Sequence, residues 1–302
     1  MSKPIINLSY RPDSQDEISA LADHAIRKAG VIGRLPTPID DLISAAGVRD
    51  EPNPNALQES FLASLAASAR NGFHLALQKI RGIADPRERV VHVPNNSTPP
   101  RLLFAKGHEL GHQVIPWQQM NIGYQDDNFS LSPETEDLFD IEANFFSAEV
   151  IFQGTGFRKR ALDYKASLDT AFYLANEHGA SKHATLRRLI EESDELVAAA
   201  FYWPNRYVLD SNGRSILKLG TATCSPRFVT KYSDIELPDF IDSNHPWTEA
   251  RRDSDEVCNG DINLRCGSSQ ICFQWQSWWN TYCLQVFLRR RPVLSLGRHL
   301  TI

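Results

Sequence analysis

The sequence predicts an α+β protein in three parts: a helical domain with a small twisted sheet over residues 1–160, a helical hairpin over 161–200, and a β-rich domain over 201–302. Before about residue 200, apolar residues mostly recur at helical spacing. After it, aromatic, β-branched and cysteine residues dominate, separated by Pro and Asn-Gly turns. A chain of 302 residues is also long enough for more than one domain.

The first helices are marked by residues typical of helix ends. Residues 14–30 have the pattern of an amphipathic helix, and Ser14 is the expected N-cap. Thr37 is the expected N-cap of a second, short helix over about 38–47. A third helix is expected over 56–70, where Asn-Gly follows.

The remaining elements follow from changes of periodicity. "FHLALQKI" (73–80) and "RVVHVP" (89–94) are expected to form two strands of a small sheet. Helices are expected over 133–153, where Ser132 and Pro133 mark the start, and as a pair over 167–193 with a turn at "HGAS". The stretch 271–291 predicts one or two strands.

Composition excludes several classes of protein. Hydrophobic residues make up 42% and charged residues 23% of the chain, which is usual for a globular protein with a buried core. The net charge of −5 argues against a nucleic-acid surface along the whole chain. We see no apolar run long enough for a membrane span, and no secretory signal at the start. Five cysteines, all beyond residue 220, do not fit a disulfide scaffold, so we expect a cytoplasmic protein with reduced thiols.

One motif carries chemistry: "FAKGHELGHQVI" contains His-Glu-Leu-Gly-His over 108–112. His108 and His112 are four residues apart, so on a helix they share one face and can hold one Zn²⁺. Glu109 is offset from that face, which suits a general base acting on a water at the metal. The alternative is an ordinary helix. The apolar run before the motif indicates a buried helix, and buried polar groups need partners, which favours the metal.

A hydrolytic zinc site needs a third protein ligand. No His occurs between His112 and His178, so a carboxylate is the expected donor. Glu142 lies in the apolar stripe of the helix 133–153, where an unpaired charge is costly, and we expect it to be the third ligand. Glu149 follows two turns later and is expected either to orient a histidine or to pair with an arginine, with a structural role favoured.

Together, "RLLFAKGHELGHQVI" and "DIEANFFSAEVIF" resemble the ImmA/IrrE-type zinc metallopeptidases over about residues 20–195. The resemblance implies a zincin-like domain with one Zn²⁺ per chain, bound by His108, His112 and Glu142, with Glu109 as the base. It also implies a substrate class, namely helix-turn-helix repressors, whose cleavage switches on stress, mobile-element or defence genes. The chain departs from the family at "VIFQGTGF", where L-L-x-P is usual, and at Gly107, where Ala is usual.

The segment "LANEHGASKHATLRRL" (174–189) resembles a helix-turn-helix, in which Lys182, Arg187 and Arg188 could contact phosphates. A helical hairpin packed on the rest of the chain is the favoured interpretation, because the chain is acidic overall. Direct DNA binding is therefore the less favoured partner, after a protein substrate.

The C-terminal cysteines and tryptophans have two interpretations each. A second metal site is disfavoured because no pair has the C-x₂-C spacing; the residues concerned are Cys224, Cys258, Cys266, Cys272 and Cys283, with His245. A cluster of three tryptophans, in a domain that could be a sensor or bind a partner, could line a ligand pocket, but packing in a core or interface is favoured; these are Trp275, Trp278 and Trp279.

Two functions remain in view. The favoured one is a zinc endopeptidase acting on an extended protein segment, which could add to the edge of the small sheet near 89–94. The other is a non-catalytic regulatory protein that acts through DNA or protein contacts. Candidate oxyanion stabilisers, chosen by residue type, are Tyr124, His74 and His92. A site of this type could also hold Mn²⁺ or Fe²⁺.

Overall fold

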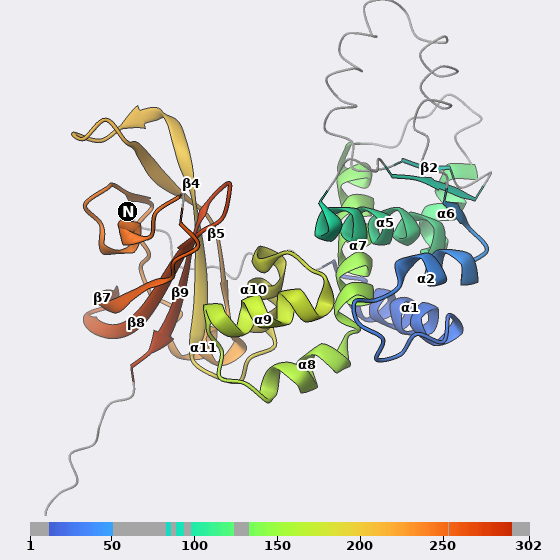
Figure 1. The fold of residues 1–302 in the computed structure, drawn as a ribbon, viewed down its shortest axis with the longest axis horizontal. Coiled ribbons are helices and arrows are strands. Elements are labelled where there is room, and N and C mark those ends of the chain that lie inside the picture. The colour runs from blue at the N-terminus through green and yellow to red at the C-terminus, as the bar shows by residue number, and fades with distance from the viewer. Residues whose placement is uncertain are drawn as a thin grey trace, which may run out of the picture. The chain divides into compact units, whose positions relative to one another are not determined.

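A computed structural model describes residues 12–50, 83–85, 89–93, 98–123, 133–252 and 254–291 of the chain (Figure 1). The helix expected over 56–70 and the strand expected over 73–80 lie outside these residues. Helices and strands are both present, which confirms the α+β class. No helix in the described part of the chain is both long and apolar enough to cross a membrane.

The chain divides into two compact units. We name them the helical unit, which is Tyr10–Arg160 with Leu174–Ser181, and the sheet unit, which is Met1–Ser9, Ala161–Tyr173 and Lys182–Ile302. The hairpin expected over 161–200 is shared between the two, and the three-part division of the chain stays a prediction.

In its described residues the helical unit combines helices with a small sheet of three strands. Its helices are α1 (Gln15–Lys28), α2 (Ile39–Ala45), α5 (Pro99–Val114), α6 (Pro116–Gly123), α7 (Pro133–Phe152) and most of α8 (Thr155–Leu162). Its strands are β1 (Arg49–Asp50), β2 (Ile83–Asp85) and β3 (Val90–His92). In the described sheet β3 is central, with β1 parallel on one side and β2 antiparallel on the other. In the described sheet both sides of β3 are paired, so a substrate could not add to β3 itself, as the expected edge near 89–94 would require.

Helix α7 is the centre of the helical unit, and both α1 and α5 pack against it. Leu110, Phe146 and Val150 are fully buried where these helices meet. Gly111 brings α5 very close to α7, since a Cβ atom there would lie only 3.1 Å from the Cα of Ala143. This close approach places the two-histidine face of α5 beside α7.

Two residues expected to be helix N-caps are used differently. Ser14 precedes α1 but forms no side-chain cap; its Oγ donates instead to Glu142 at 2.6 Å. Thr37 does not cap α2, whose N-cap is Pro38; its Oγ1 donates to the carbonyl of Val150, in the last turn of α7, at 3.0 Å. The helices are where the sequence predicts. Ser14 holds the predicted N-cap position without a side-chain cap, whereas the assignment of Thr37 is wrong; both hydroxyls bind groups on α7 instead.

Helix α7 ends at Phe152, and Gln153 then adopts a left-handed φ of 51°. The Gln153 amide accepts from Gly33 N at 2.7 Å and donates to the carbonyl of Arg34 at 3.0 Å and to Thr37 Oγ1 at 3.1 Å. In "VIFQGTGF", the Gln153 side chain therefore hydrogen-bonds the end of α7 to the loop between α1 and α2.

The sheet unit is built on one antiparallel sheet of six strands in the order β6-β5-β4-β9-β8-β7. The strands are β4 (Val197–Leu209), β5 (Ser215–Cys224), β6 (Phe240–Ile241), β7 (Cys258–Cys266), β8 (Ser269–Trp279) and β9 (Leu284–Arg290), and two short helices accompany them, α11 (Pro226–Lys231) and η2 (Pro246–Glu249). The stretch 271–291 therefore forms most of two paired strands, β8 and β9.

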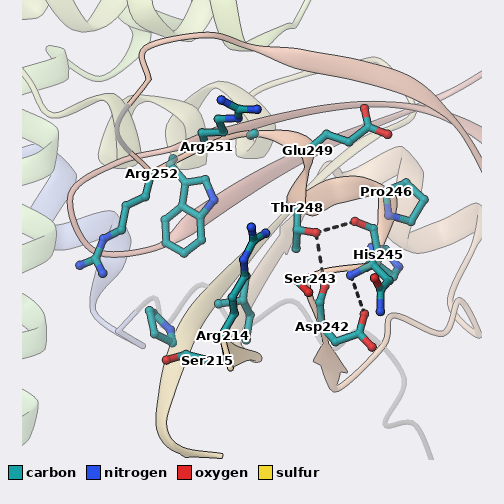
Figure 2. A pocket seen from close by; sticks show the side chains of 15 residues that line it. Arg214, Ser215, Asp242, Ser243, His245, Pro246, Thr248, Glu249, Arg251 and Arg252 are labelled. Carbon is teal, nitrogen blue, oxygen red and sulfur yellow. Dashed lines mark hydrogen bonds between the residues drawn. The ribbon is translucent and has the colours of Figure 1, made fainter. Parts of the chain in front are cut away.

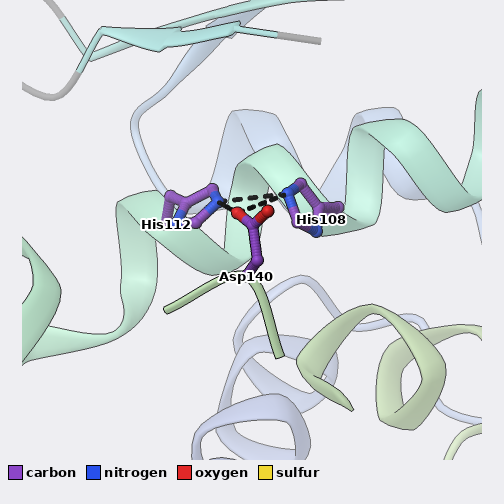
Figure 3. A group of neighbouring side chains, drawn as sticks. All are labelled: His108, His112 and Asp140. Carbon is purple, nitrogen blue, oxygen red and sulfur yellow. Dashed lines mark hydrogen bonds and ion pairs between the residues drawn. The ribbon is translucent and has the colours of Figure 1, made fainter. Parts of the chain in front are cut away.

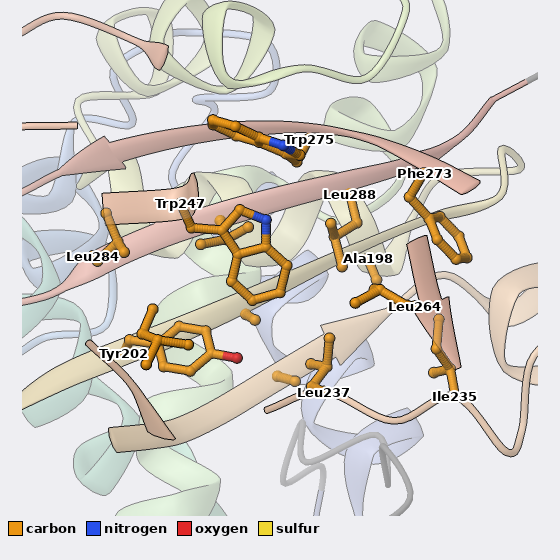
Figure 4. Close-up of a cluster of buried hydrophobic side chains, with 14 of the residues drawn as sticks. Ala198, Tyr202, Ile235, Leu237, Trp247, Leu264, Phe273, Trp275, Leu284 and Leu288 are labelled. Atoms are coloured by element: carbon orange, nitrogen blue, oxygen red, sulfur yellow. The ribbon is translucent and has the colours of Figure 1, made fainter. Parts of the chain in front are cut away.

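One face of this sheet carries a large apolar core (Figure 4). Trp247 is fully buried there, and Trp275 is only 3% exposed. Trp278 is also buried, whereas Trp279 is partly buried at the margin of the core. Core packing is thus confirmed for two of the three clustered tryptophans. The five cysteines are free thiols, and burial raises the pKa of Cys224 and of Cys283 to about 12, so these two are poor metal ligands and weak nucleophiles.

The hairpin consists of α9 (Leu168–His178) and α10 (Lys182–Glu191). Helix α10 packs on β4 and β5. Lys182 Nζ lies 4.3 Å from the ring centroid of Phe172 and 4.4 Å from that of Trp278. Arg188 is buried and pairs with Glu192 at 3.2 Å. Two of the three residues considered for phosphate contacts are therefore used within the sheet unit, which supports a packing role for the hairpin.

His183 on α10 makes the stability of the sheet unit depend on pH. Its ring stacks on Phe201 with centroids 4.2 Å apart, and burial lowers its pKa from 6.5 to about 4, with the Arg187 charge adding to the shift. Between these two pH values the unfolded chain binds more protons than the folded chain, so the free energy of unfolding falls as the pH is lowered. We expect His183→Gln to reduce the loss between pH 7 and 4.5 by at most about 3 kcal/mol.

Urea unfolding at the two pH values, followed by tryptophan fluorescence, measures this effect, since the sheet unit holds five of the six tryptophans. An equal loss of stability in the variant and the wild type would contradict the assignment.

Candidate metal centre

The motif lies on α5, where the sequence predicts a buried helix. Pro99 and Pro100 occupy its first positions, and it ends at Val114 because Ile115, which precedes a proline, is extended with ψ 112°. His108 and His112 project from the same face, with ring centroids 4.7 Å apart. Their Nε2 atoms are 3.1 Å apart.

A carboxylate from α7 meets these two nitrogens. Asp140 Oδ1 lies 3.8 Å from His108 Nε2 and 3.7 Å from His112 Nε2 (Figure 3). The three ligand atoms lie within 4.8 Å of one another, and among the described residues this is the group of His, Cys, Asp or Glu side chains with metal-ligand spacing. The Asp140 side chain is 68% exposed, so solvent can reach the three ligand atoms from the side where Asp140 lies.

Hydrogen bonds fix the tautomer of both imidazoles. His112 Nδ1 lies 2.7 Å from Gln118 Oε1, and His108 Nδ1 lies 3.1 Å from Asn144 Oδ1. With the amides in this orientation each Nδ1 carries the hydrogen, so each Nε2 presents a lone pair. Two lone pairs and a carboxylate would repel one another without a cation between them.

The geometry of this group fits a zinc ion. Two nitrogens bound to one tetrahedral zinc at about 2.0–2.1 Å would be separated by about 3.3 Å, close to the separation of the two Nε2 atoms. Metal binding by His108 and His112 stays a prediction, and their arrangement agrees with it.

Glu142, the expected third ligand, does not join this group. It is 4% exposed, and its carboxylate accepts hydrogen bonds from Ser14 Oγ at 2.6 Å, Trp117 Nε1 at 2.7 Å and Gln118 Nε2 at 2.8 Å. A buried carboxylate does need partners, as the sequence suggests, but here neutral donors provide them. Through Gln118 the carboxylate acts on His112 indirectly. We therefore replace Glu142 by Asp140 as the third ligand of the proposed site.

The sequence contains a signal for Asp140 that an apolar stripe does not reveal. Asp140 and Asn144 are four residues apart, so they share the face of α7 that contacts the two histidines. Glu142 lies about 200° around the helix from Asp140, because each residue turns an α-helix by about 100°. A carboxylate four residues before an Asn is therefore consistent with a ligand here, but only once the contact of that face with α5 is known.

Glu109, the expected base, is buried on α5 with 4% exposure. Burial, reinforced by the charge of Asp140, raises its pKa to about 8. A cation held at Asp140 would favour the charged form of Glu109 and so oppose this shift. Glu149 is also buried, but it lies outside the group with metal-ligand spacing.

Not all expected residues can be placed. Tyr124 and His74 lie outside the described residues, and of His92 only the backbone, in β3, is described. The assignment of an oxyanion stabiliser to one of these three residues therefore stays a prediction.

Comparison with known proteins gives a match to one family model and a similarity to solved structures. Residues 68–190 match the family model of the IrrE N-terminal-like domain (Peptidase_M78). Among solved structures, a Mycobacterium tuberculosis transcriptional regulator is similar, with 12% sequence identity, a TM-score of 0.51, and coverage of 91% of this chain and 77% of that chain. At this identity the similarity concerns the fold alone. Comparison with curated proteins gives no match.

Proposed function

We propose, from the premise that residues 68–190 belong to the family of IrrE N-terminal-like domains, that this chain is a zinc-dependent endopeptidase with a zincin-like catalytic domain. The observation that carries the proposal is the convergence of His108, His112 and Asp140 within 4.8 Å, with Glu109 beside the first histidine. Three ligands from the chain leave one position open, which is the arrangement of catalytic zinc sites rather than structural ones.

Each residue of the proposed site has a separate role. His108, His112 and Asp140 hold the metal, and Asn144 and Gln118 orient the two imidazoles. A bound zinc ion supplies Lewis acidity, which polarises a peptide carbonyl and lowers the pKa of water. Glu109 accepts a proton from the attacking water and returns it to the leaving amine.

The substrate in this proposal is a helix-turn-helix transcriptional repressor, whose cleavage would derepress stress, mobile-element or defence genes. The family resemblance at "HELGH" and "DIEANFF" supports this choice. The fold similarity to a protein named as a transcriptional regulator is compatible with a regulatory setting. A cytoplasmic location belongs to the same proposal.

The substitution Glu109→Gln tests the catalytic step. We expect it to lower the rate of cleavage by about 10²–10⁴-fold, because an amide cannot accept the proton, while about one metal per chain remains bound. Purified wild type and variant, each loaded with zinc, are incubated with repressors encoded near the gene, and fragments are measured by mass spectrometry. Asp137→Asn, an exposed change on α7, is the matched control and should cleave normally.

Equal cleavage by wild type and Glu109→Gln would contradict the assigned base. A zinc-loaded wild type that cleaves none of the repressors but binds one of them would favour the alternative function, a regulatory binding protein in which the metal stabilises the fold.

A further inference from the structure

The sheet unit contains a pocket of about 1030 Å³ that the peptidase proposal does not use (Figure 2). It is formed by the start of β5, the loop and η2 helix over 242–250, and the end of β8. Its volume is that of a site for a molecule of nucleotide size. The residues that line it include Arg214, Arg251, Arg252, Ser243, His245 and Trp279.

Hydrogen bonds hold the walls of this pocket in place. Asp210 accepts from the backbone N–H of Arg214 at 2.9 Å through Oδ1 and from that of Ser243 at 3.0 Å through Oδ2, which joins the β4–β5 turn to the loop before η2. Thr248 Oγ1 donates to the carbonyl of His245 at 2.7 Å within that loop. The pocket is therefore pre-formed, which lowers the entropic cost of binding a ligand.

Among the described residues, the arginines of this pocket have no carboxylate partner. Arg214 and Arg251 make no hydrogen bond or ion pair through their guanidinium groups with a described residue, and Arg252 donates only to the carbonyl of Thr281 at 3.1 Å. Four other arginines of the same unit pair with carboxylates: Arg188 with Glu192, Arg265 with Glu236, Arg289 with Glu195, and Arg291 with Asp261. Arg227 and Arg290 donate to backbone carbonyls instead. Unpaired guanidinium groups around one pocket repel one another unless an anion lies between them.

Two carboxylates also line the pocket, Asp242 and Glu249, so three guanidinium groups face two carboxylates. Asp242 Oδ1 accepts from Asn244 N at 2.9 Å, and neither carboxylate pairs with Arg214, Arg251 or Arg252 among the described residues. In Figure 2 Arg251 and Arg252 lie toward the left and Arg214 near the centre, whereas Asp242 lies with His245 toward the right. The positive side of the pocket is therefore not neutralised by its own lining.

Further donors and an aromatic ring complete the site. His245 Nδ1 accepts from the backbone N–H of Trp247 at 3.3 Å, so its Nε2 carries the hydrogen and is a donor. The Arg252 guanidinium carbon lies 5.9 Å from the ring centroid of Trp279. An indole and a guanidinium plane can both stack on a flat ring of a ligand.

We propose that this pocket binds a small phosphorylated molecule that carries an aromatic ring, as nucleotides do. Guanidinium groups match the oxygens of a phosphate in forked pairs, which a single lysine cannot do. Arg214 and Arg251 provide the forks, and Trp279 with Arg252 provides the stacking surface. The site does not depend on the peptidase proposal, since every residue in it belongs to the sheet unit.

Calorimetric titration of the full chain tests the site with three probes: pyrophosphate, ADP and adenosine. We expect pyrophosphate to bind with a Kd below about 1 mM, ADP to bind at least as tightly, and adenosine to bind at least tenfold more weakly than ADP. The double variant Arg214→Gln, Arg251→Gln should weaken pyrophosphate and ADP at least tenfold. The charge-matched control is Arg265→Gln, Arg291→Gln, which alters two exposed arginines outside the pocket and should bind as the wild type does.

Phosphates also bind metals, so the same titrations are repeated with His108→Ala. Binding that survives His108→Ala and is lost in the pocket double variant supports the proposal. Binding that is lost in His108→Ala and survives the pocket double variant overturns it, because the anion is then held by the metal centre. Failure of both pyrophosphate and ADP to bind the wild type also overturns it.

Discussion

Replacing Asp140 by alanine should remove most of the zinc from the chain. Its carboxylate is the group that reaches both His108 Nε2 and His112 Nε2, and the two imidazoles alone leave too few ligands. We expect zinc affinity to fall by more than the roughly 10–100-fold that is typical when a residue behind a ligand is changed. Elemental mass spectrometry after dialysis against a chelator measures the zinc that each chain retains. Asp137→Ala on the same helix is the control and should retain about one zinc.

Glu142→Gln should behave differently, and the comparison distinguishes the two candidate ligands. The amide keeps the size of the side chain but places an N–H₂ group among three hydrogen-bond donors, so the free energy of unfolding should fall by about 1–3 kcal/mol. Zinc affinity should fall by no more than roughly 10–100-fold, because Glu142 acts through Gln118. A chain that loses zinc with Glu142→Gln and keeps it with Asp140→Ala would restore Glu142 as the ligand.

Gly107→Ala should destabilise the helical unit by about 1–3 kcal/mol, because a well-packed helix contact has no room for the added methyl group. A Cβ atom at residue 107 would lie 2.5 Å from Ser147 Oγ and 3.3 Å from Ser147 Cα, so α5 and α7 would have to move apart. Urea unfolding followed by circular dichroism measures the change. Gly156→Ala is the control: Gly156 is exposed in α8, its nearest neighbour would be 3.8 Å from the new Cβ atom, and we expect no loss of stability.

A double-mutant cycle with Ser147→Ala shows whether the two positions act together. Ser147 Oγ donates to the carbonyl of Phe104 at 2.9 Å, so Ser147→Ala alone should cost about 1 kcal/mol. Combined with Gly107→Ala it removes the worst contact, and the pair should be more stable than the two single effects predict. Additive effects would show that the hydroxyl is not what excludes alanine at 107.

The sequence predicts the helices well where their signals are local. Prolines mark the starts of α5 and α7, and the residue before Pro116 marks the end of α5. The same local signals predict the relation between His108 and His112, because both residues lie on one helix. Composition and turn residues predict the β-rich character of residues 201–302.

The third ligand could not be predicted in this way, because the rotation of α7 about its axis depends on a contact with another helix. Gly111 against Ala143 brings α5 close, and this contact turns Asp140 and Asn144 toward the histidines. Ser14 and Thr37 show the same limit. Their residue types suit helix N-caps, but their partners on α7 are more than 100 residues away.

Four side chains connect the start of the first helix to the metal centre. Ser14 donates to Glu142, Gln118 donates to the other oxygen of Glu142, and Gln118 accepts from His112. If a metal binds at His112, as we propose, these hydrogen bonds would couple the docking of α1 to metal binding, and such coupling is reciprocal. A metal that orders His112 would then protect α1 from local opening. A ligand that displaces α1 would lower the affinity for the metal, by the factor by which the metal lowers the affinity for that ligand.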